Sequence, residues 1–560
     1  MRQKKKKNLI IAILGFLLSI SSLIIIYVGD LPLFNLQLIS FEDEEGDNLI
    51  GQYHRGNKET GIIILEGFST DQMAMRSINS EFTKLGFHTF SFDFSGQGRS
   101  GGTLGFDNAA TDRLAKQVLS AKEEFKSLSG LNDSQIILLG HSMGARVALQ
   151  ATTMEIYNVS GLILIGVQVN LIPNVQAGFF TGVSDLELEW IQNLSISNPP
   201  VDILLLSGSL DDIISPKAAR LLFEKLGENS GTYIRELEIF PLLSHNYEIY
   251  SPFLITKSIN WAIENLGLES NPQYFALQAL LRKIFWVIAL IGLFMIPLFG
   301  AQYLSEIRKN SSAKEIKKNH NNQRSNNLKI KDIKRFFKFK LLYWIGAIPI
   351  ALLLLSLLFF IPIGLPIFSL FYVGFIGSYG ILMLILYKKG KVAGTQGKLT
   401  INFKVEKESI DKNLGIVIVF SLLVIVICGL FFNSGINYVF PINARVIWLI
   451  IFTILTIPGF FIGQKEATLL SDSEYASGKN KIILWIIGLV PFLVISIFFA
   501  ILGSISGMIG SIHGIIILVF IIVSGNFISK ISKQLVITII YQSFLIQLLI
   551  LTQGALFAIL

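Results

Sequence analysis

Nine long apolar stretches constrain the fold of this 560-residue chain more than any other feature of its sequence. Each lacks Lys, Arg, Asp and Glu, and each is close to the ~20 residues that a helix needs to cross ~30 Å of hydrocarbon. Only 15% of the chain is charged, which is low for a soluble protein. The stretches lie at about 8–28, 284–304, 341–361, 366–387, 414–433, 446–463, 482–502, 508–528 and 535–558. We therefore predict a multi-pass membrane protein with nine transmembrane helices.

The distribution of Lys and Arg predicts how these helices are oriented. If the strongly basic N-terminus stays in the cytoplasm, nine spans place 29 Lys and Arg residues on that side. The short loops on the other side, at 362–365, 434–445 and 503–507, hold only Arg445. We expect a cell-membrane protein with a cytoplasmic N-terminus, and we expect the long segment between the first two spans to lie outside.

Five segments follow from this topology. Residues 1–30 are expected to form a basic cytoplasmic tail and a signal-anchor helix, and residues 31–270 an extracytoplasmic domain. Residues 271–305 are expected to form an interfacial segment and the second span. The basic, Asn- and Ser-rich segment 306–340 is expected to be a disordered cytoplasmic loop, without the interleaved aromatic residues of a nucleic-acid site. Residues 341–560 are expected to hold seven further spans.

The extracytoplasmic domain alternates short apolar strands with helices. After a predicted hairpin at 36–41 and 49–53, we expect strands at 61–65, 88–94, 135–139, 161–166, 202–207 and 233–240. The helices are expected near 72–85, 107–128, 145–151, 216–226 and 248–265. Fully apolar strands that alternate with helices predict an α/β domain whose mostly parallel sheet is covered on both faces. Ligands of such sheets bind beyond the carboxyl ends of the strands.

The motif Gly140-His141-Ser142-Met143-Gly144 lies between the predicted strand 135–139 and the predicted helix that follows it. This is the strand–turn–helix context of a nucleophile elbow. The sharp turn strains the backbone of the central residue, so its neighbours must be small, and the two glycines meet that need. Ser142 is therefore predicted to present its hydroxyl above the edge of the sheet.

Residues 36–265 resemble the α/β-hydrolase superfamily, within the group of monoacylglycerol lipases, lysophospholipases and serine aminopeptidase-like proteins. The membrane part resembles no family that we recognise. Besides the elbow, the motifs that carry the resemblance are Leu65-Glu-Gly-Phe-Ser69, Asp93-Phe-Ser-Gly-Gln-Gly-Arg-Ser100, Gly208-Ser-Leu-Asp-Asp-Ile-Ile-Ser-Pro216 and Ser244-His-Asn-Tyr-Glu248. They follow one another in the order in which this fold places its oxyanion loop, nucleophile, acid and base.

The resemblance implies a Ser–His–Asp triad. Ser142 would be the nucleophile, and His245, after the last strand, would be the base that a serine hydroxyl needs. Asp211 follows Gly208 by three residues, as the acid does in relatives, and would orient the imidazole. Asp212 is the alternative acid, and whichever aspartate is unused is expected to be a solvated turn or cap residue.

The oxyanion donors implied by this fold are the backbone N–H groups of Phe68 and Met143. Glu66 stands where many relatives have His. Because the loop needs backbone donors more than a particular side chain, this departure does not exclude catalysis.

A short cap is expected at 168–200. Its aromatic residues Phe179, Phe180 and Trp190 are candidate substrate-binding residues that could line an apolar wall for an acyl chain. The alternative is that they only pack the cap onto the domain. No metal site and no organic cofactor are expected.

Together these features predict a membrane-anchored serine hydrolase that cleaves a small-molecule or lipid-derived ester outside the cell. Membrane lipid is the expected surrounding partner, and nucleic acid is not expected. The same triad could serve a peptidase or amidase, or a membrane acyltransferase. A non-catalytic, hydrolase-like sensor for the membrane domain is the remaining alternative.

Overall fold

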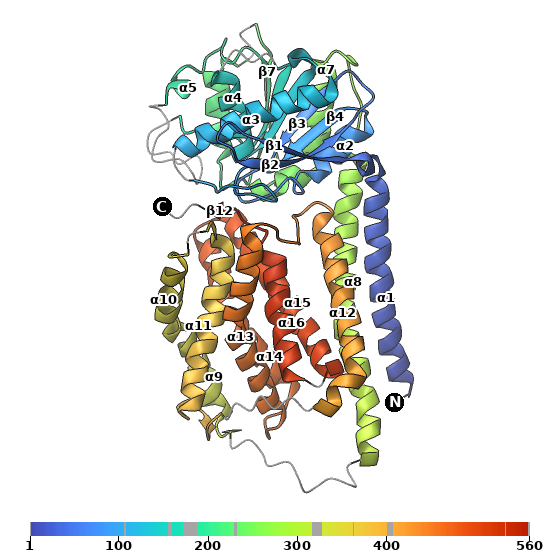
Figure 1. Ribbon diagram of the computed structural model, residues 1–560, viewed down its shortest axis with the longest axis vertical. Helices are drawn as coiled ribbons and strands as arrows, with labels where there is room; N and C mark the ends of the chain where they lie inside the picture. The colour runs from blue at the N-terminus through green and yellow to red at the C-terminus, as the bar shows by residue number, and fades with distance from the viewer. Residues whose placement is uncertain are drawn as a thin grey trace.

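The computed structural model describes residues 2–105, 108–154, 159–171, 188–228, 232–315, 328–361, 363–399, 407–532 and 534–557. An α/β domain lies on one end of a bundle of long helices, and the two are joined by α1 (Arg2–Gly29) and α8 (Leu277–Glu315) (Figure 1). The N-terminus lies at the far end of the bundle, whereas the C-terminal end of the chain lies close to the α/β domain.

The α/β domain is built on an eight-stranded sheet with the order β1-β2-β4-β3-β5-β6-β7-β8. Its strands are β1 (Gln37–Glu42), β2 (Asn48–His54), β3 (Gly61–Leu65), β4 (His88–Phe92), β5 (Ile136–His141), β6 (Gly161–Ile165), β7 (Asp202–Gly208) and β8 (Arg235–Phe240). β2 pairs antiparallel with β1 and β4, and all other neighbours are parallel. The mostly parallel sheet expected from the apolar strands is therefore confirmed.

Helices cover both faces of this sheet. α2 (Arg76–Lys84) and α7 (Pro252–Asn265) pack on one face, and α3 (Asn108–Ser129), α4 (Met143–Met154) and α6 (Pro216–Lys225) on the other. Along β3, Ile62 and Ile64 enter the first layer, whereas Ile63 and Leu65 enter the second. This alternation is the period of two that a strand buried on both faces requires.

The helical domain contains α9 (Ile333–Gly346), α10 (Ile348–Leu358), α11 (Ile367–Lys388), α12 (Lys407–Asn433), α13 (Ala444–Ser471), α14 (Gly478–Ile501), α15 (Ile505–Ser532) and α16 (Leu535–Ile550). Among the described residues, eight helices are long and apolar enough to cross a membrane, with α9 and α10 counted together as one of them. Large apolar side chains such as Leu352 and Val419 are more than 60% exposed on these helices. Such a surface fits hydrocarbon rather than water.

Two of the predicted boundaries are wrong. The ninth span, expected at 535–558, is a helix of only 16 residues, because the chain leaves the helix after Ile550 and forms the short strand β12 (Leu556–Phe557). Within the expected segment 271–305, helix α8 begins at Leu277. The expected disordered loop 306–340 is helical up to Glu315 and again from Ile333, and residues 316–327 lie outside the described residues.

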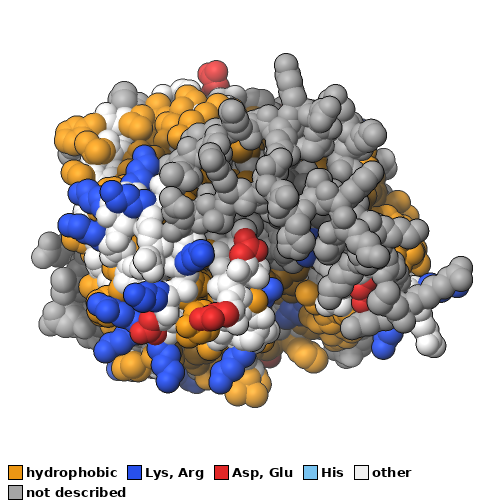
Figure 2. All heavy atoms as spheres, turned by 90° about the horizontal axis from the view of Figure 1, so that it is seen from below, with side chains coloured by type: hydrophobic (Ala, Val, Ile, Leu, Met, Phe, Trp, Pro, Cys, Tyr) orange, Lys and Arg blue, Asp and Glu red, His pale blue; other side chains and the backbone are white. Residues whose placement is uncertain are grey.

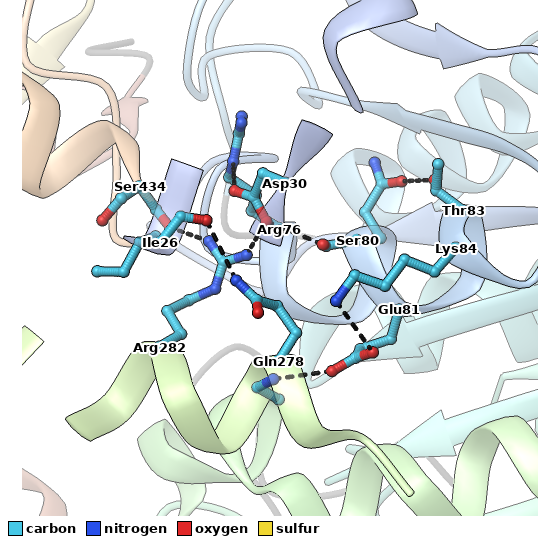
Figure 3. A network of polar contacts seen from close by, with 12 residues as sticks. Ile26, Asp30, Arg76, Ser80, Glu81, Thr83, Lys84, Gln278, Arg282 and Ser434 are labelled. Atoms are coloured by element: carbon cyan, nitrogen blue, oxygen red, sulfur yellow. Dashed lines mark hydrogen bonds and ion pairs between the residues drawn. The ribbon is translucent and has the colours of Figure 1, made fainter. Parts of the chain in front are cut away.

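A buried ionic cluster joins the two domains where α1 ends (Figure 3). Asp30 lies between Arg282 of α8 and Arg76 of α2, with Arg76 Nε 2.8 Å from Asp30 Oδ2. Ser80 also donates to Asp30 at 2.9 Å, and Arg282 donates to the carbonyl of Ser434 in the α12–α13 loop. Burial opposes the charge on Asp30, but the two guanidinium groups hold the pKa of its carboxyl below the usual value.

Replacement of Asp30 by Ala is expected to destabilise the protein by about 3–5 kcal/mol, because Arg282 would remain buried without its carboxylate. The depressed pKa fixes the sign of the pH dependence. The contribution of Asp30 is complete above its unfolded pKa of about 4 and is lost as the pH falls through the lower folded value. Thermal unfolding in detergent measures both effects, with Asp133→Ala, at a more exposed ion pair, as the control. Equal stability of the two variants would contradict the central role of Asp30.

Arg445, at the start of α13, fastens the helical domain to the turn that follows β4. It is fully buried, and its guanidinium donates to the carbonyls of Gly98 at 3.0 Å, Gly96 at 2.8 Å and Gly554 at 3.0 Å. The one basic residue in the predicted outer loops is thus part of an interface between the domains.

The C-terminal strand β12 contributes to the same interface. The Leu556 N–H donates to the Gly96 carbonyl at 2.7 Å, and its carbonyl accepts from the Leu104 N–H at 2.8 Å. β12 also pairs with β10 (Leu365–Pro366) of the helical domain. The ring of Phe557 lies tilted against that of Phe68, with ring centroids 5.6 Å apart. The loops at the carboxyl ends of the strands therefore face the helical domain.

Candidate active site

Ser142 occupies a strained turn between β5 and α4, with a φ of +55°. A Cβ on Gly140 would lie 2.4 Å from the carbonyl carbon of Gly144, and a Cβ on Gly144 would lie 2.4 Å from the carbonyl oxygen of Glu66. Both positions therefore require glycine. The Ser142 N–H donates to the Ile165 carbonyl of β6 at 2.8 Å, which fixes the turn to the sheet. This is the geometry of a nucleophile elbow.

Asp211 and His245 meet although 34 residues separate them. His245 Nδ1 lies 2.7 Å from Asp211 Oδ2, and both side chains are buried. The other carboxylate oxygen of Asp211 accepts from the backbone N–H groups of Ile213 at 3.0 Å and Ile214 at 2.7 Å. Burial of the imidazole alone would lower its pKa, but the hydrogen bond and charge of Asp211 raise the pKa of His245 above the usual value.

The bond to Asp211 leaves Nε2 as the free ring nitrogen of His245. The hydrogen bonds of the described residues include none between this imidazole and the Ser142 hydroxyl. The ring of His141, the residue before Ser142, lies 4.7 Å from the His245 ring between centroids. Catalytic hydrogen bonds of this kind often tighten only when substrate binds.

Glu248 is a buried residue of the site. It belongs to the motif Ser244–Glu248, but the sequence did not identify it as a functional residue. Its Oε1 accepts from the Gly208 N–H at 2.6 Å, and its Oε2 lies 3.7 Å from His245 Nδ1 and 3.4 Å from His141 Nε2. Burial raises the pKa of Glu248 to about 8, against the opposing influence of His245. At pH 7 the Glu248 side chain is therefore mostly neutral, and Asp211 is the carboxylate that holds His245.

Asp212, unlike Asp211, contacts the helical domain. Its carboxylate accepts from the hydroxyls of Ser504, the residue before α15, at 2.7 Å and of Ser506, in the first turn of α15, at 2.6 Å. Asp212 is exposed, and its carboxylate also accepts from the Ser506 backbone N–H at 3.0 Å, so the unused aspartate is a cap residue at the N-terminus of α15. The sequence could not reveal this contact, because 294 residues separate Asp212 from Ser506.

The candidate oxyanion loop, residues 66–69, is braced by Gln97. The Gln97 side-chain amide donates to Glu66 Oε1 at 2.8 Å and to the Gly67 carbonyl at 3.1 Å, and its oxygen accepts from the Ser69 N–H. Phe68 thus lies in a loop fixed on both sides, and Met143 is the first residue of α4. The fixed loop can hold the two backbone N–H donors in place.

Replacement of Gln97 by Ala is expected to lower kcat about 10²-fold, because small displacements of transition-state donors have effects of that order. Gln117→Ala is the matched control, since it removes an equally buried amide that bonds to Asp43 and Ser95 instead. Steady-state kinetics on a short-chain ester would show the difference. A similar kcat for the two variants would exclude a role for Gln97 in positioning the loop.

Three buried acids are Glu66, the first residue of the oxyanion loop, and Asp71 and Asp93, whose charges act on it. Burial first, and then the charges of the other two acids, raise the pKa of Glu66 well above the usual value. Burial and Asp93 raise the pKa of Asp71 to about 8. Glu66, which stands where many relatives have His, braces the loop by accepting from the Phe94 N–H at 3.0 Å and from the Gln97 amide at 2.8 Å.

The cap residues are only partly placed. Phe179 and Phe180 lie outside the described residues, which stop at 171 and resume at 188. Trp190 lies on α5 (Glu189–Gln192), is 9% exposed, and covers the guanidinium of Arg146 at 5.3 Å. These contacts are those of a residue that packs the cap onto the domain.

Donor atoms of His141, His245 and Glu248 lie within 4.8 Å of one another, the spacing of a metal site. However, the Nδ1 atom of His245 is bonded to Asp211 at 2.7 Å, and Glu248 is mostly neutral at pH 7. Metal ligands must be deprotonated. The donor set therefore fits an acid–base pair better than a metal, and we assign no metal to it.

The sheet order, the elbow after β5, and the acid and base after β7 and β8 define an α/β-hydrolase fold with serine at its elbow. The family described as serine aminopeptidase, S33 matches residues 56–199. No curated protein matches the chain.

Three solved structures of similar fold each cover less than half of this chain. A putative α/β hydrolase of unknown function from Agrobacterium tumefaciens is 21% identical, covers 42% of this chain and 100% of its own, and gives a TM-score of 0.33. The esterase Pf2001 from Pyrococcus furiosus is 15% identical, with coverages of 41% and 92% and a TM-score of 0.33. Est1E from Butyrivibrio proteoclasticus, solved with ferulic acid, is 16% identical, with coverages of 41% and 99% and a TM-score of 0.33.

Proposed function

We propose that this protein is a membrane-anchored serine hydrolase that cleaves an acyl ester outside the cell through Ser142, His245 and Asp211. The observation that carries the proposal is the 2.7 Å bond between His245 Nδ1 and Asp211, at the same sheet edge as the strained Ser142. A buried acid–imidazole pair beside a nucleophile elbow is the arrangement that activates a serine hydroxyl.

In the proposed reaction, Ser142 Oγ attacks the acyl carbonyl while His245 Nε2 accepts its proton. The backbone N–H groups of Phe68 and Met143 stabilise the oxyanion, and Asp211 stabilises the imidazolium. His245 then protonates the leaving alcohol, and the ester bond breaks to give an acyl-enzyme. Water then attacks the acyl carbonyl while His245 accepts its proton. His245 returns this proton to Ser142 Oγ as the carboxylic acid leaves.

The charge of the helical domain supports the proposed orientation. Lys and Arg side chains gather on the end opposite the α/β domain (Figure 2). Exposed basic residues in and next to the connections between α8 and α9 and between α11 and α12 include Lys329 and Lys391, Lys334 and Arg335 in the first turn of α9, and Lys388 at the end of α11. Basic segments stay on the cytoplasmic side of a membrane. The α/β domain at the other end would then lie outside the cell.

Product analysis tests the proposed reaction class. The full-length chain in detergent would be incubated with a short-chain ester carrying a labelled acyl group, in the presence of glycerol and, separately, phospholipid. Release of labelled free acid is the expected result. Label in a new ester would instead indicate acyl transfer, and turnover of an aminoacyl anilide but no ester would indicate a peptidase. No turnover by folded protein would favour the sensor alternative.

A further inference from the structure

We propose that helix α15 of the helical domain positions the acid and the base of the active site. This inference rests on the proposed function, and it gives the helical domain a part in the reaction. α15 and Ser504, the residue directly before it, contact the acid turn through Ser504 and Ser506 and the base helix through His513. We call these three residues the α15 clamp.

The acid arm of the clamp is a set of hydrogen bonds to Asp212. Ser504 Oγ donates to Asp212 Oδ2 at 2.7 Å, and Ser506 Oγ and backbone N–H donate to Asp212 Oδ1 at 2.6 and 3.0 Å. The carboxylate thus sits at the N-terminus of a 28-residue helix, where negative charge is stabilised. Because Asp212 directly follows Asp211, these bonds fix the turn that carries the acid.

The base arm is a hydrogen bond to Tyr247. The Tyr247 hydroxyl lies 3.1 Å from His513 Nε2, and their rings are 6.3 Å apart between centroids. Tyr247 lies two residues after His245, within the same short 3-10 helix His245–Tyr250. Movement of His513 would therefore displace the helix that begins with the base.

Both arms lie on one face of one rigid helix. Ser506 and His513 are seven residues apart, which is close to two turns of an α-helix, so their side chains point the same way. α15 also packs against α8, α14 and α16 within the bundle. Hence the spacing between the Asp211 turn and the His245 helix is set partly by the helical domain. Helix movement within the bundle would change that spacing.

Kinetics of clamp variants test the proposal in the full-length chain. We would compare the double variant Ser504→Ala/Ser506→Ala, and separately Tyr247→Phe, with Ser511→Ala. Ser511 lies on the same helix but bonds to Ser496, 2.7 Å away, within the bundle. On p-nitrophenyl butyrate, the double variant is expected to lose about 10–100-fold in kcat with KM changed less than about threefold. Ser506→Thr keeps the hydroxyl, and this variant is expected to retain most of the rate of the unmodified chain.

Hydrogen–deuterium exchange gives a second readout that does not need turnover. Faster exchange at residues 209–214 and 244–250 in the double variant, with an unchanged thermal midpoint, supports the clamp. The clamp proposal would be overturned if the double variant showed unchanged exchange and a kcat within threefold of that of Ser511→Ala. It would also be overturned if Ser506→Thr lost as much rate as the double variant. If exchange changes as expected but the unmodified chain shows no turnover that depends on Ser142, the proposed function fails and the positioning role fails with it.

Discussion

Replacement of Ser142 by Ala is expected to lower kcat for ester hydrolysis on the order of 10⁶-fold, because the acyl-enzyme can no longer form. The substitution leaves the backbone donors of Phe68 and Met143 in place, so KM should change far less. The measurement is steady-state hydrolysis of p-nitrophenyl butyrate by the full-length chain. It requires enough protein to detect residual rates near the uncatalysed reaction.

A buried serine elsewhere provides the control for this variant. Ser258 lies on α7, and its hydroxyl donates to the Leu254 carbonyl of the same helix at 3.0 Å. Ser258→Ala should therefore retain nearly the full rate. If Ser142→Ala kept more than about a tenth of the activity, another nucleophile would have to carry the reaction.

Replacement of Asp211 by Asn is expected to lower kcat about 10⁴-fold, as loss of the triad carboxylate does when the geometry is retained. Asp211 also raises the pKa of His245 above 6.5. The base is active only when neutral, so the rate of the unmodified enzyme should rise with pH through a value above 6.5. Without the negative charge, burial dominates, and the rise should move to lower pH in Asp211→Asn.

Glu248→Gln is the matched variant for this prediction. Glu248 Oε2 lies 3.7 Å from His245 Nδ1, whereas Asp211 Oδ2 lies 2.7 Å away. Because the pKa of Glu248 is raised to about 8, Gln resembles its predominant form at pH 7. The pH–rate profile of Glu248→Gln should therefore stay close to that of the unmodified enzyme below pH 7. If Glu248→Gln shifted the pH–rate profile and Asp211→Asn did not, Glu248 rather than Asp211 would be the acid of the triad.

Local sequence patterns predicted the fold and the elbow because both depend on neighbouring residues. Short apolar strands alternating with helices are sufficient to indicate a covered parallel sheet. The glycines at 140 and 144 indicate a turn with no room for a Cβ. In the structure, a Cβ at either position would lie 2.4 Å from a backbone atom. The pairing of Asp211 with His245 needed the resemblance as well, because nothing local joins residues 34 positions apart.

The features that the sequence did not predict depend on contacts between distant residues. Gln97 braces a loop about 30 residues away, and Asp212 bonds to a helix 294 residues away. No periodicity connects such positions. The boundaries of the spans failed for a different reason. Apolar composition does not separate a helix from the coil and strand that follow Ile550, and α8 continues to Glu315, beyond the end of its apolar stretch.

The contacts between the domains give the helical domain a specific relation to the active site. Arg445 was the one basic residue in the predicted outer loops. Its guanidinium donates hydrogen bonds to carbonyls of the turn after β4. That turn also carries Gln97, which braces the oxyanion loop. Together with the α15 clamp, this places contacts from the helical domain behind the oxyanion loop, the acid turn and the base helix.

The most direct test of the central claim is to locate a covalent adduct. The full-length chain would be treated with a fluorophosphonate, digested, and analysed by tandem mass spectrometry. We predict a single adduct on Ser142 that is absent from Ser142→Ala and strongly slowed in Asp211→Asn. An adduct on a different residue, or none on the folded chain, would contradict the proposal that Ser142, His245 and Asp211 form a working active site.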